Sequence, residues 1–255
     1  MKLKQLFKQT PSDLFWNFLA MCGYRKVMDL EGLVKSYDQD DPWMVGANWG
    51  KYHPDNLKCW WRKPRIIDGK ILFFPIREPL VSEAHEVIPY SVGKINTYPF
   101  KQKYGYWEIN CNISLQEALR HAFWGWADSD DRPKPINMYR EIDFFEIDSL
   151  QGKQKINVHY GTRKNSKSQM IGPINLNTVK PGEMQRFGFN WDETKMEWYV
   201  DNSRVFRLTN KKILRWFNEN ETAIWTLISQ DVIGELGPEY GRMIVDYVAL
   251  YKLER

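Results

Sequence analysis

Cysteine is scarce in this chain of 255 residues. The three cysteines, Cys22, Cys59 and Cys111, are odd in number and lack the close spacing of metal-binding motifs. The sequence therefore excludes a disulfide framework and a cysteine-ligated zinc site, and at most one disulfide can form. Cys111 falls on the apolar side of an alternating segment, so we expect it to be buried.

Long apolar runs are also missing, which excludes a membrane-spanning helix of ordinary length. Lysines precede the mixed segment 14–22, but Asp13 and Asn17 interrupt its apolar character and no small-x-small cleavage site follows. It is therefore no clear signal peptide. We favour a short amphipathic helix capped by Ser12, so residues 1–40 are predicted to be a helical appendage that packs on the remainder or mediates attachment.

No block of like charge occurs. The chain has 36 basic and 32 acidic residues and a net charge of +4 without clustering, which argues against a nucleic-acid partner. The densest basic run, residues 163–167, is interpreted as a solvated loop, although it could meet an anionic polymer such as a sulfated galactan. Internal repeats and low-complexity tracts are absent too.

Aromatic residues, by contrast, are abundant, with 12 Trp, 13 Tyr and 13 Phe. Large rings fill the core of a β-sandwich, and they also form the platforms on which sugar rings stack. From Pro42 onward the pattern is one of short alternating segments separated by turn residues, such as Asp68-Gly69 between two apolar runs. Residues 78–90 carry two prolines and read as a loop, and residues 211–220 as a short helix. The pattern predicts one all-β domain over residues 41–255.

The segment Arg-Glu-Ile-Asp-Phe-Phe-Glu at residues 140–146 is the most informative in the chain. In an extended strand Glu141 and Asp143 point to the same face, whereas Glu146, five positions after Glu141, points to the other. A β-bulge within Phe144 and Phe145 would reset the alternation and bring all three carboxylates to one face. Like charges so close together repel one another and destabilise the fold, so their grouping indicates a function.

Retaining glycoside hydrolysis uses such a set, because one carboxylate attacks the sugar and a protonated partner about 5–5.5 Å away donates to the leaving oxygen. A carboxyl group between them can share protons or hydrogen bonds with both and separate their pKa values. Two alternatives remain open on spacing alone. The segment could be an exposed acidic strand face, or a calcium site, since hard cations suit clustered carboxylates.

The segment Glu-Ile-Asp-Phe-Phe-Glu resembles the Glu-x-Asp-x-x-Glu signature of glycoside hydrolase family 16, in the form found in its laminarinase, lichenase, agarase and carrageenase branch. Further segments are similar to the family's pattern in the family's order, over roughly residues 43–252. These are Tyr-Gly-Tyr-Trp-Glu at 104–108, Ala-Phe-Trp at 122–124, Val-His-Tyr-Gly at 158–161, Phe-Asn-Trp at 189–191, Trp-Tyr-Val-Asp at 198–201 and Val-Asp-Tyr-Val at 245–248.

The resemblance implies a concanavalin-like β-jelly-roll sandwich and a retaining endo-acting hydrolase that cleaves internal β-linkages of a polysaccharide. By position in the motif, Glu141 would be the nucleophile and Glu146 the general acid/base, with Asp143 tuning and orienting Glu141. No cofactor is expected. Asp246 lies in a strand that the family sometimes uses for a structural calcium, but a buried, hydrogen-bonded role is the simpler expectation.

Candidate substrate-binding residues also follow from the resemblance. His159 would border the cleft near the acid, and Glu108 would hydrogen-bond sugar hydroxyls. Asn110 stands where many members have Arg, and Tyr139 where glucanases often have a stacking Trp. Trp124 and Trp191 match cleft aromatics, whereas Trp107 and Trp198 are expected in the core. The full candidate set is Glu108, Asn110, Trp124, Tyr139, His159 and Trp191.

The expected partner is a β-glucan or a galactan, which could be sulfated; a monomer is expected. Such a substrate implies an extracellular or cell-surface location. The Trp-Pro-x-x-Gly lead-in of β-1,3-glucanases is replaced here by residues 135–140, which keeps galactans open. The alternative function is a non-catalytic glycan-binding jelly roll carried by the N-terminal appendage, and transfer of the glycosyl unit to another sugar is a further variant of the chemistry.

Overall fold

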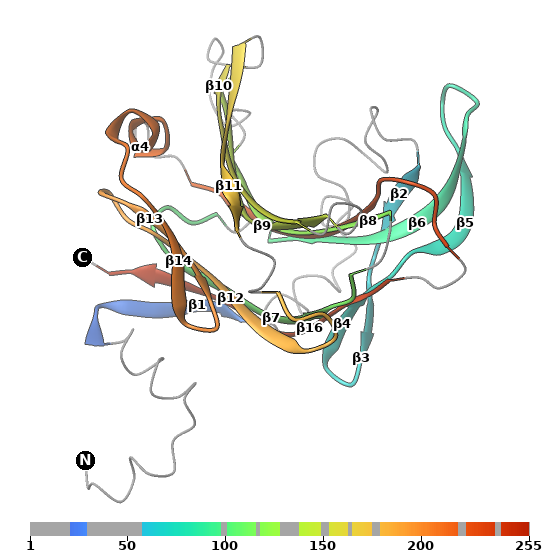
Figure 1. Cartoon of the computed structure of the whole chain (residues 1–255), viewed down its shortest axis with the longest axis horizontal. Coiled ribbons are helices and arrows are strands. Elements are labelled where there is room, and N and C mark those ends of the chain that lie inside the picture. Colours follow the sequence, from blue (N-terminus) through green and yellow to red (C-terminus); the bar gives the residue numbers. More distant parts are fainter. Residues whose placement is uncertain are drawn as a thin grey trace, which may run out of the picture.

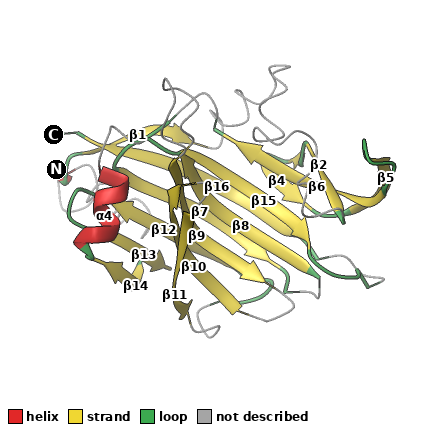
Figure 2. Ribbon diagram, turned by 90° about the horizontal axis from the view of Figure 1, so that it is seen from above, coloured by secondary structure: helices red, strands yellow, loops and turns green. Residues whose placement is uncertain are grey.

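The computed structural model describes residues 21–29, 58–97, 101–115, 118–127, 138–148, 153–162, 165–174, 179–218, 223–237 and 241–254. These residues form two sheets of eight strands each, packed face to face, with one helix at the side (Figures 1 and 2). The predicted all-β sandwich is confirmed.

One sheet has the order β11-β10-β9-β8-β15-β6-β2, with β5 paired to β6; it curves so that its outer face is hollow, and we call it the concave sheet (Figure 1). Its strands are β2 Cys59–Arg62, β5 Ile76–Val81, β6 Val87–Asn96, β8 Leu119–Ala127, β9 Met138–Asp148, β10 Lys153–Thr162, β11 Asn165–Ile174 and β15 Trp225–Val232. Neighbours are antiparallel except β2 and β6.

The other sheet, which we call the backing sheet, has the order β14-β13-β12-β7-β16-β4-β3, with β1 paired to β16. Its strands are β1 Tyr24–Asp29, β3 Arg65–Ile67, β4 Lys70–Phe73, β7 Gly105–Ile113, β12 Met184–Trp191, β13 Met196–Val200, β14 Ser203–Leu208 and β16 Met243–Leu253. Helix α4, Lys211–Asn218, follows β14 and confirms the helix predicted at residues 211–220.

The core lies between the sheets and is largely aromatic. Trp107 and Trp198 are fully buried there, as predicted, and Phe144 stacks on Phe189 at 4.5 Å between ring centres. Cys111 is also buried, as expected. These rings come from both sheets, so apolar burial in this layer fixes which face of each strand points inward.

The turn predicted at Asp68-Gly69 is confirmed, whereas the loop predicted at residues 78–90 is wrong. Asp68 and Gly69 both have positive φ, 50° and 73°, and join β3 to β4 as a two-residue turn. Residues 78–90 were predicted to be a loop because of Pro79 and Pro89, but most of them lie in β5 and β6. The pairing of β5 with β6 shifts register between Arg77 and Leu80, where a proline removes a ladder donor.

The N-terminal prediction needs correction at residues 24–29. They form strand β1, which pairs with the C-terminal end of β16 and so extends the sandwich, where a helical appendage was predicted. The predicted helix itself, around residues 14–19, lies outside the described residues. Among the described residues, α4 has eight residues and is too short and polar to cross a membrane.

His121 on β8 is fully buried next to Gln230, whose amide nitrogen lies 3.5 Å from its Nδ1. Burial lowers the pKa of His121 to about 4, below its ordinary 6.5. The unfolded chain therefore binds a proton at His121 more readily than the folded chain does. The stability that neutral, buried His121 contributes is complete above pH 6.5 and is lost as the pH falls toward 4. We expect about 3 kcal/mol of unfolding free energy to be lost over this range.

Urea unfolding of the wild type and of His121→Gln from pH 4 to 8 measures this effect. The variant keeps the other titrating groups, so its stability should fall less steeply on acidification than that of the wild type. Parallel pH curves for the two proteins would contradict the assignment.

Candidate active site

Strand β9 carries the predicted bulge. Phe123 of β8 pairs with Phe145 and the next residue, Trp124, pairs with Asp143, so Phe144 is the extra residue in the ladder. Phe144 and Phe145 are both buried in the core. Glu141, Asp143 and Glu146 therefore share the opposite, concave face of the sheet.

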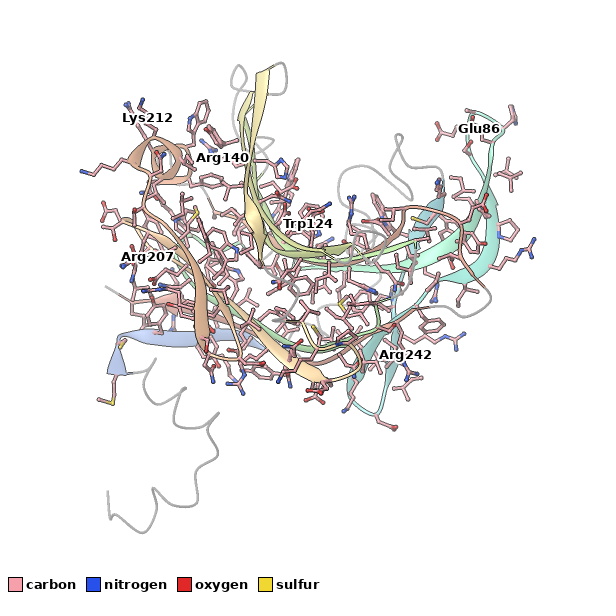
Figure 3. All side chains as sticks on the ribbon, in the orientation of Figure 1. Glu86, Trp124, Arg140, Arg207, Lys212 and Arg242 are labelled. Carbon is pink, nitrogen blue, oxygen red and sulfur yellow. The ribbon has the colours of Figure 1, made fainter. Side chains whose placement is uncertain are left out.

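The neighbouring strands surround this triplet. On β8, Trp126, Trp124 and Ala122 lie in register with Glu141, Asp143 and Glu146 respectively. On β10, His159, Asn157 and Lys155 stand opposite the same three carboxylates. Register partners in antiparallel strands share a face, so the site has an indole wall on one side and polar residues on the other. Figure 3 shows Trp124 above the concave sheet.

His159 holds the first two carboxylates together. Its Nε2 lies 3.2 Å from Asp143 Oδ2 and 3.7 Å from Glu141 Oε1. Imidazole can donate to one carboxylate at a time, so His159 orients Asp143 directly and supports Glu141 by charge when it is protonated. The predicted position of His159 beside the carboxylates is the one observed.

Asp143 is the most enclosed member of the triplet. Burial and the nearby negative charge of Glu146 raise the pKa of Asp143 well above its usual range, and hydrogen bonds with Asn157 and Glu141 offset this only in part. On the core side, the indole Nε1 of Trp198 donates to the Asp143 carbonyl oxygen at 3.1 Å. The backing sheet thus anchors the bulge that orients the triplet.

Glu146 has a hydrogen-bond donor at one carboxylate oxygen and a cation near the other. The Asn157 amide donates to Oε2 at 2.7 Å, and the Arg120 guanidinium Nη1 lies 3.6 Å from Oε1. The Glu146 side chain is about one fifth exposed and that of Arg120 about one third. Glu146 therefore stays open to an incoming group, while its orientation is set by residues from the strands on either side.

A lysine and an indole, Lys94 and Trp61, extend the concave face beyond β15. Lys94 Nζ lies 3.5 Å from the ring centre of Trp61 and 5.3 Å from that of Trp124, within cation–π range. Burial lowers the pKa of Lys94 to about 8, and the negative charges of Asp231 and Glu141 act in the opposite direction. Trp124 is on the predicted face but only 8% exposed, so it is chiefly a packed wall.

Glu108 and Asn110 are not at this site. Both lie on β7 of the backing sheet, where Glu108 pairs with Gly188 and Asn110 with Arg186. Their neighbours Trp107 and Ile109 fill the core, so these polar side chains point away from the concave sheet. Glu108 accepts a hydrogen bond from Tyr106 and lies 3.5 Å from Arg186. Burial raises the pKa of Glu108 to about 7. The prediction that these two residues bind substrate is wrong.

Trp191 is also misplaced by the prediction. It is fully buried between the sheets, stacked on Trp107 at 6.3 Å between ring centres and edge-on to Tyr104 at 5.1 Å. A residue without an exposed face cannot stack on a sugar, so Trp191 is a core residue. Tyr139 pairs with Gly161 on β10, but its side chain lies outside the described residues.

Sequence reasoning missed Arg120, Trp126, Trp61 and the contact of Asn157 with Glu146. Alternation along β8 was a usable signal, because Arg120 and Trp126 are separated from Trp124 by even numbers of residues and so share its face. No local signal identified Trp61, which reaches the site through the pairing of β2 with β6.

Glu141, Asp143 and His159 present atoms within 4.8 Å of one another, close enough for one cation. Calcium prefers six to eight oxygen ligands, and this group offers two carboxylates and a nitrogen. The set therefore suits hydrogen-bonded proton sharing better than calcium. Asp246, the other calcium candidate, is exposed and ion-paired with Lys70 at 3.0 Å, so the expectation of a buried Asp246 is wrong.

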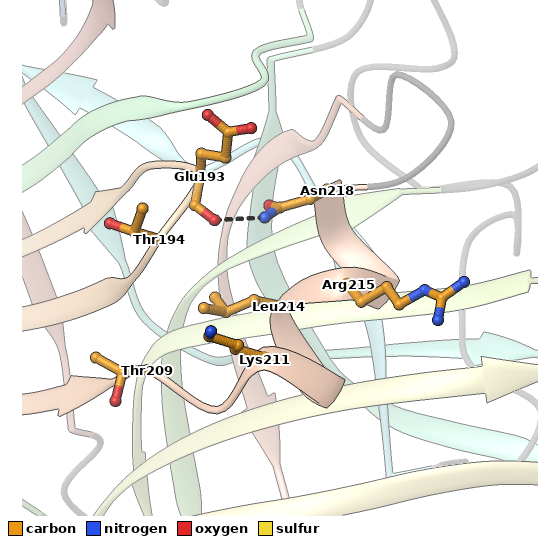
Figure 4. A pocket seen from close by; sticks show the side chains of 7 residues that line it. All are labelled: Glu193, Thr194, Thr209, Lys211, Leu214, Arg215 and Asn218. Carbon is orange, nitrogen blue, oxygen red and sulfur yellow. Dashed lines mark hydrogen bonds between the residues drawn. The ribbon is translucent and has the colours of Figure 1, made fainter.

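A cavity of about 510 Å³ lies between α4 and the turn after β12, lined by Glu193, Thr194, Thr209, Lys211, Leu214, Arg215 and Asn218 (Figure 4). Asn218 donates to the Glu193 carbonyl oxygen across it. The lining contains one carboxylate and no aromatic ring. It has neither the paired carboxylates nor the stacking surface of the concave face, so we do not assign the chemistry to it.

Comparison with known proteins identifies a family whose sequence model matches this chain. The model of the family described as glycosyl hydrolases family 16 matches residues 51–248. The chain is 26% identical over 155 residues to a xylanase/beta-glucanase of Ruminococcus flavefaciens, covering 59% of this chain and 18% of that protein. It is 22% identical over 172 residues to the endo-1,3-1,4-beta-glycanase EglC of Rhizobium meliloti (strain 1021), covering 65% and 34%. The match thus spans about a third of one relative and less than a fifth of the other.

Solved structures share the fold. The catalytic domain of an endo-1,3-beta-glucanase (laminarinase) from Thermotoga petrophila matches with a TM-score of 0.65 and 16% identity, over 91% of this chain and 99% of that chain. The kappa-carrageenase from Pseudoalteromonas carrageenovora matches with a TM-score of 0.60 and 18% identity, over 76% and 85%. At these identities the likeness concerns the arrangement of strands.

Proposed function

The chain belongs to glycosyl hydrolases family 16, and from that premise we propose that it is a retaining, endo-acting glycoside hydrolase that cleaves internal β-linkages of a polysaccharide. The observation that carries the proposal is the bulge at Phe144, which gathers Glu141, Asp143 and Glu146 on the concave face. The expected substrate is a β-glucan or a galactan. We also propose an extracellular or cell-surface location, because such polymers lie outside the cell.

In the first step Glu141 attacks the anomeric carbon while Glu146, protonated, donates to the leaving oxygen. Asp143 supports this step, because it lies between Glu141 and Glu146 and its hydrogen bond with Glu141 orients the nucleophile. His159, 3.2 Å from Asp143, fixes that carboxyl group in turn. The result is a covalent glycosyl–Glu141 ester, and the leaving chain departs with a new hydroxyl group at its non-reducing end.

In the second step Glu146, now a carboxylate, takes a proton from water, which attacks the same anomeric carbon and releases Glu141. The Asn157 amide at 2.7 Å holds the carboxylate in place for this role. Two displacements at one carbon restore the original configuration. A sugar acceptor in place of water would give glycosyl transfer through the same intermediate.

Hydrolysis is tested by following reducing ends released from laminarin, mixed-linkage glucan, agarose, porphyran and carrageenans. We expect release from at least one polymer, with a rapid fall in viscosity that marks internal cleavage. NMR of the first product should show the β-anomer before mutarotation. An α-anomer would contradict retention, and glycan binding without new reducing ends across the panel would favour the non-catalytic glycan-binding alternative.

A further inference from the structure

We infer that Arg120 makes this site selective for a sugar that carries an anionic substituent, a sulfate ester or a carboxylate, on the leaving-group side of the cleaved bond. The inference rests on the proposed function and concerns the acid/base Glu146. It begins from the contact between Arg120 Nη1 and Glu146 Oε1 at 3.6 Å.

Both contacts of Glu146 come from groups that donate only. The Asn157 amide nitrogen holds Oε2 at 2.7 Å, and the guanidinium faces Oε1. This arrangement serves the carboxylate of the second step. The longer, more exposed contact is that of Arg120, so it is the one that substrate can open.

Arg120 has room to do so. It stands at the end of the row on β8 that continues through Ala122 and Trp124, opposite the acidic end of β9, and its side chain is about one third exposed. A planar guanidinium recognises sulfate and carboxylate groups through paired hydrogen bonds. An anionic substituent on the departing sugar would draw Arg120 away from Oε1 and pair with its guanidinium.

Other cations near the carboxylates are less suited to this exchange. Lys94 is buried against Trp61, and His159 faces Asp143 and Glu141 rather than Glu146. Lys155 stands opposite Glu146 in the β9–β10 register, which makes it the appropriate control for positive charge in general.

The test compares kcat/KM of four proteins: the wild type, Arg120→Met, Arg120→Lys and Lys155→Met. The sulfated substrates are κ-carrageenan and porphyran, each also tested after chemical desulfation. C6-oxidised agarose supplies carboxylates, and laminarin is the neutral glucan. The wild type should prefer an anionic polymer over its neutral counterpart by roughly 10- to 100-fold, the worth of a charged hydrogen-bond pair. Arg120→Met should remove most of that preference, because kcat/KM falls more on the anionic polymer than on its neutral counterpart. Arg120→Lys should retain part of the preference. The polymer that shows the largest difference identifies sulfate or carboxylate as the group.

Equal rates of the wild type on charged and neutral polymers, or activity on laminarin alone, would overturn the inference and leave the hydrolase proposal standing. If Lys155→Met lost the preference for anionic polymers as fully as Arg120→Met, the preference would come from overall positive charge, and the role of Arg120 would also be overturned. Failure of the wild type to cleave any polymer would instead contradict the proposed function.

Discussion

Glu141→Gln is expected to lower polysaccharide cleavage by roughly 10⁴-fold or more, because the amide cannot form the glycosyl ester and no other carboxylate has the same position. His159 and Asp143 would still surround residue 141, so glycan binding should persist. Reducing-end release measured beside binding by affinity electrophoresis separates the two effects. Rates within tenfold of the wild type would show that Glu141 is not the nucleophile.

The loss should not come from unfolding. The substitution removes one of three neighbouring carboxylates on the concave face, and like charges in such a group destabilise the folded state. We therefore expect Glu141→Gln to unfold at or above the wild-type temperature. Glu193→Gln is the matched control, since Glu193 lies in the separate cavity beside α4 and its substitution should leave activity unchanged.

Glu146→Ala is expected to lower polysaccharide cleavage by roughly 10²- to 10⁴-fold, the usual contribution of a general acid/base. The loss should be much smaller in the first step for a dinitrophenyl glycoside, whose leaving group departs without a proton. With such a substrate the glycosyl–Glu141 intermediate should accumulate, and mass spectrometry of the intact protein would detect it.

Azide distinguishes the two glutamates. In Glu146→Ala it can replace water without a general base, so activity on the dinitrophenyl glycoside should recover with increasing azide and yield a β-glycosyl azide. Glu141→Gln should give no such product of retained configuration. If azide restored the Glu141 variant with β-product instead, the nucleophile and acid/base assignments would have to be exchanged.

Local sequence was sufficient for the features that depend on neighbours in the chain. The odd spacing of Glu141 and Glu146, with two phenylalanines between them, predicted the bulge on β9, and Asp68-Gly69 predicted the β3–β4 turn. Backbone geometry and side-chain alternation decide these features within a few residues.

The predictions that failed depended on which sheet a strand joins. Alternation correctly separated Glu108 from Trp107, but each strand of a sandwich has one core face and one outer face in either sheet. The polar face of β7 was predicted to line the substrate site, whereas β7 pairs with β12 and β16 in the backing sheet. The prediction for Trp191 failed for a related reason, since an aromatic residue suits both a buried core and a platform for sugar stacking.

By itself, the sequence determined the three carboxylates, the bulge that turns them to one side and the all-β class, because these follow from residue type and spacing. Tertiary structure alone decided that Arg120 and Asn157 meet Glu146, and that Lys94 and Trp61 share its sheet. Those contacts join different strands, and they are set by the register in which the strands pair and by how the two sheets bury their apolar faces against each other.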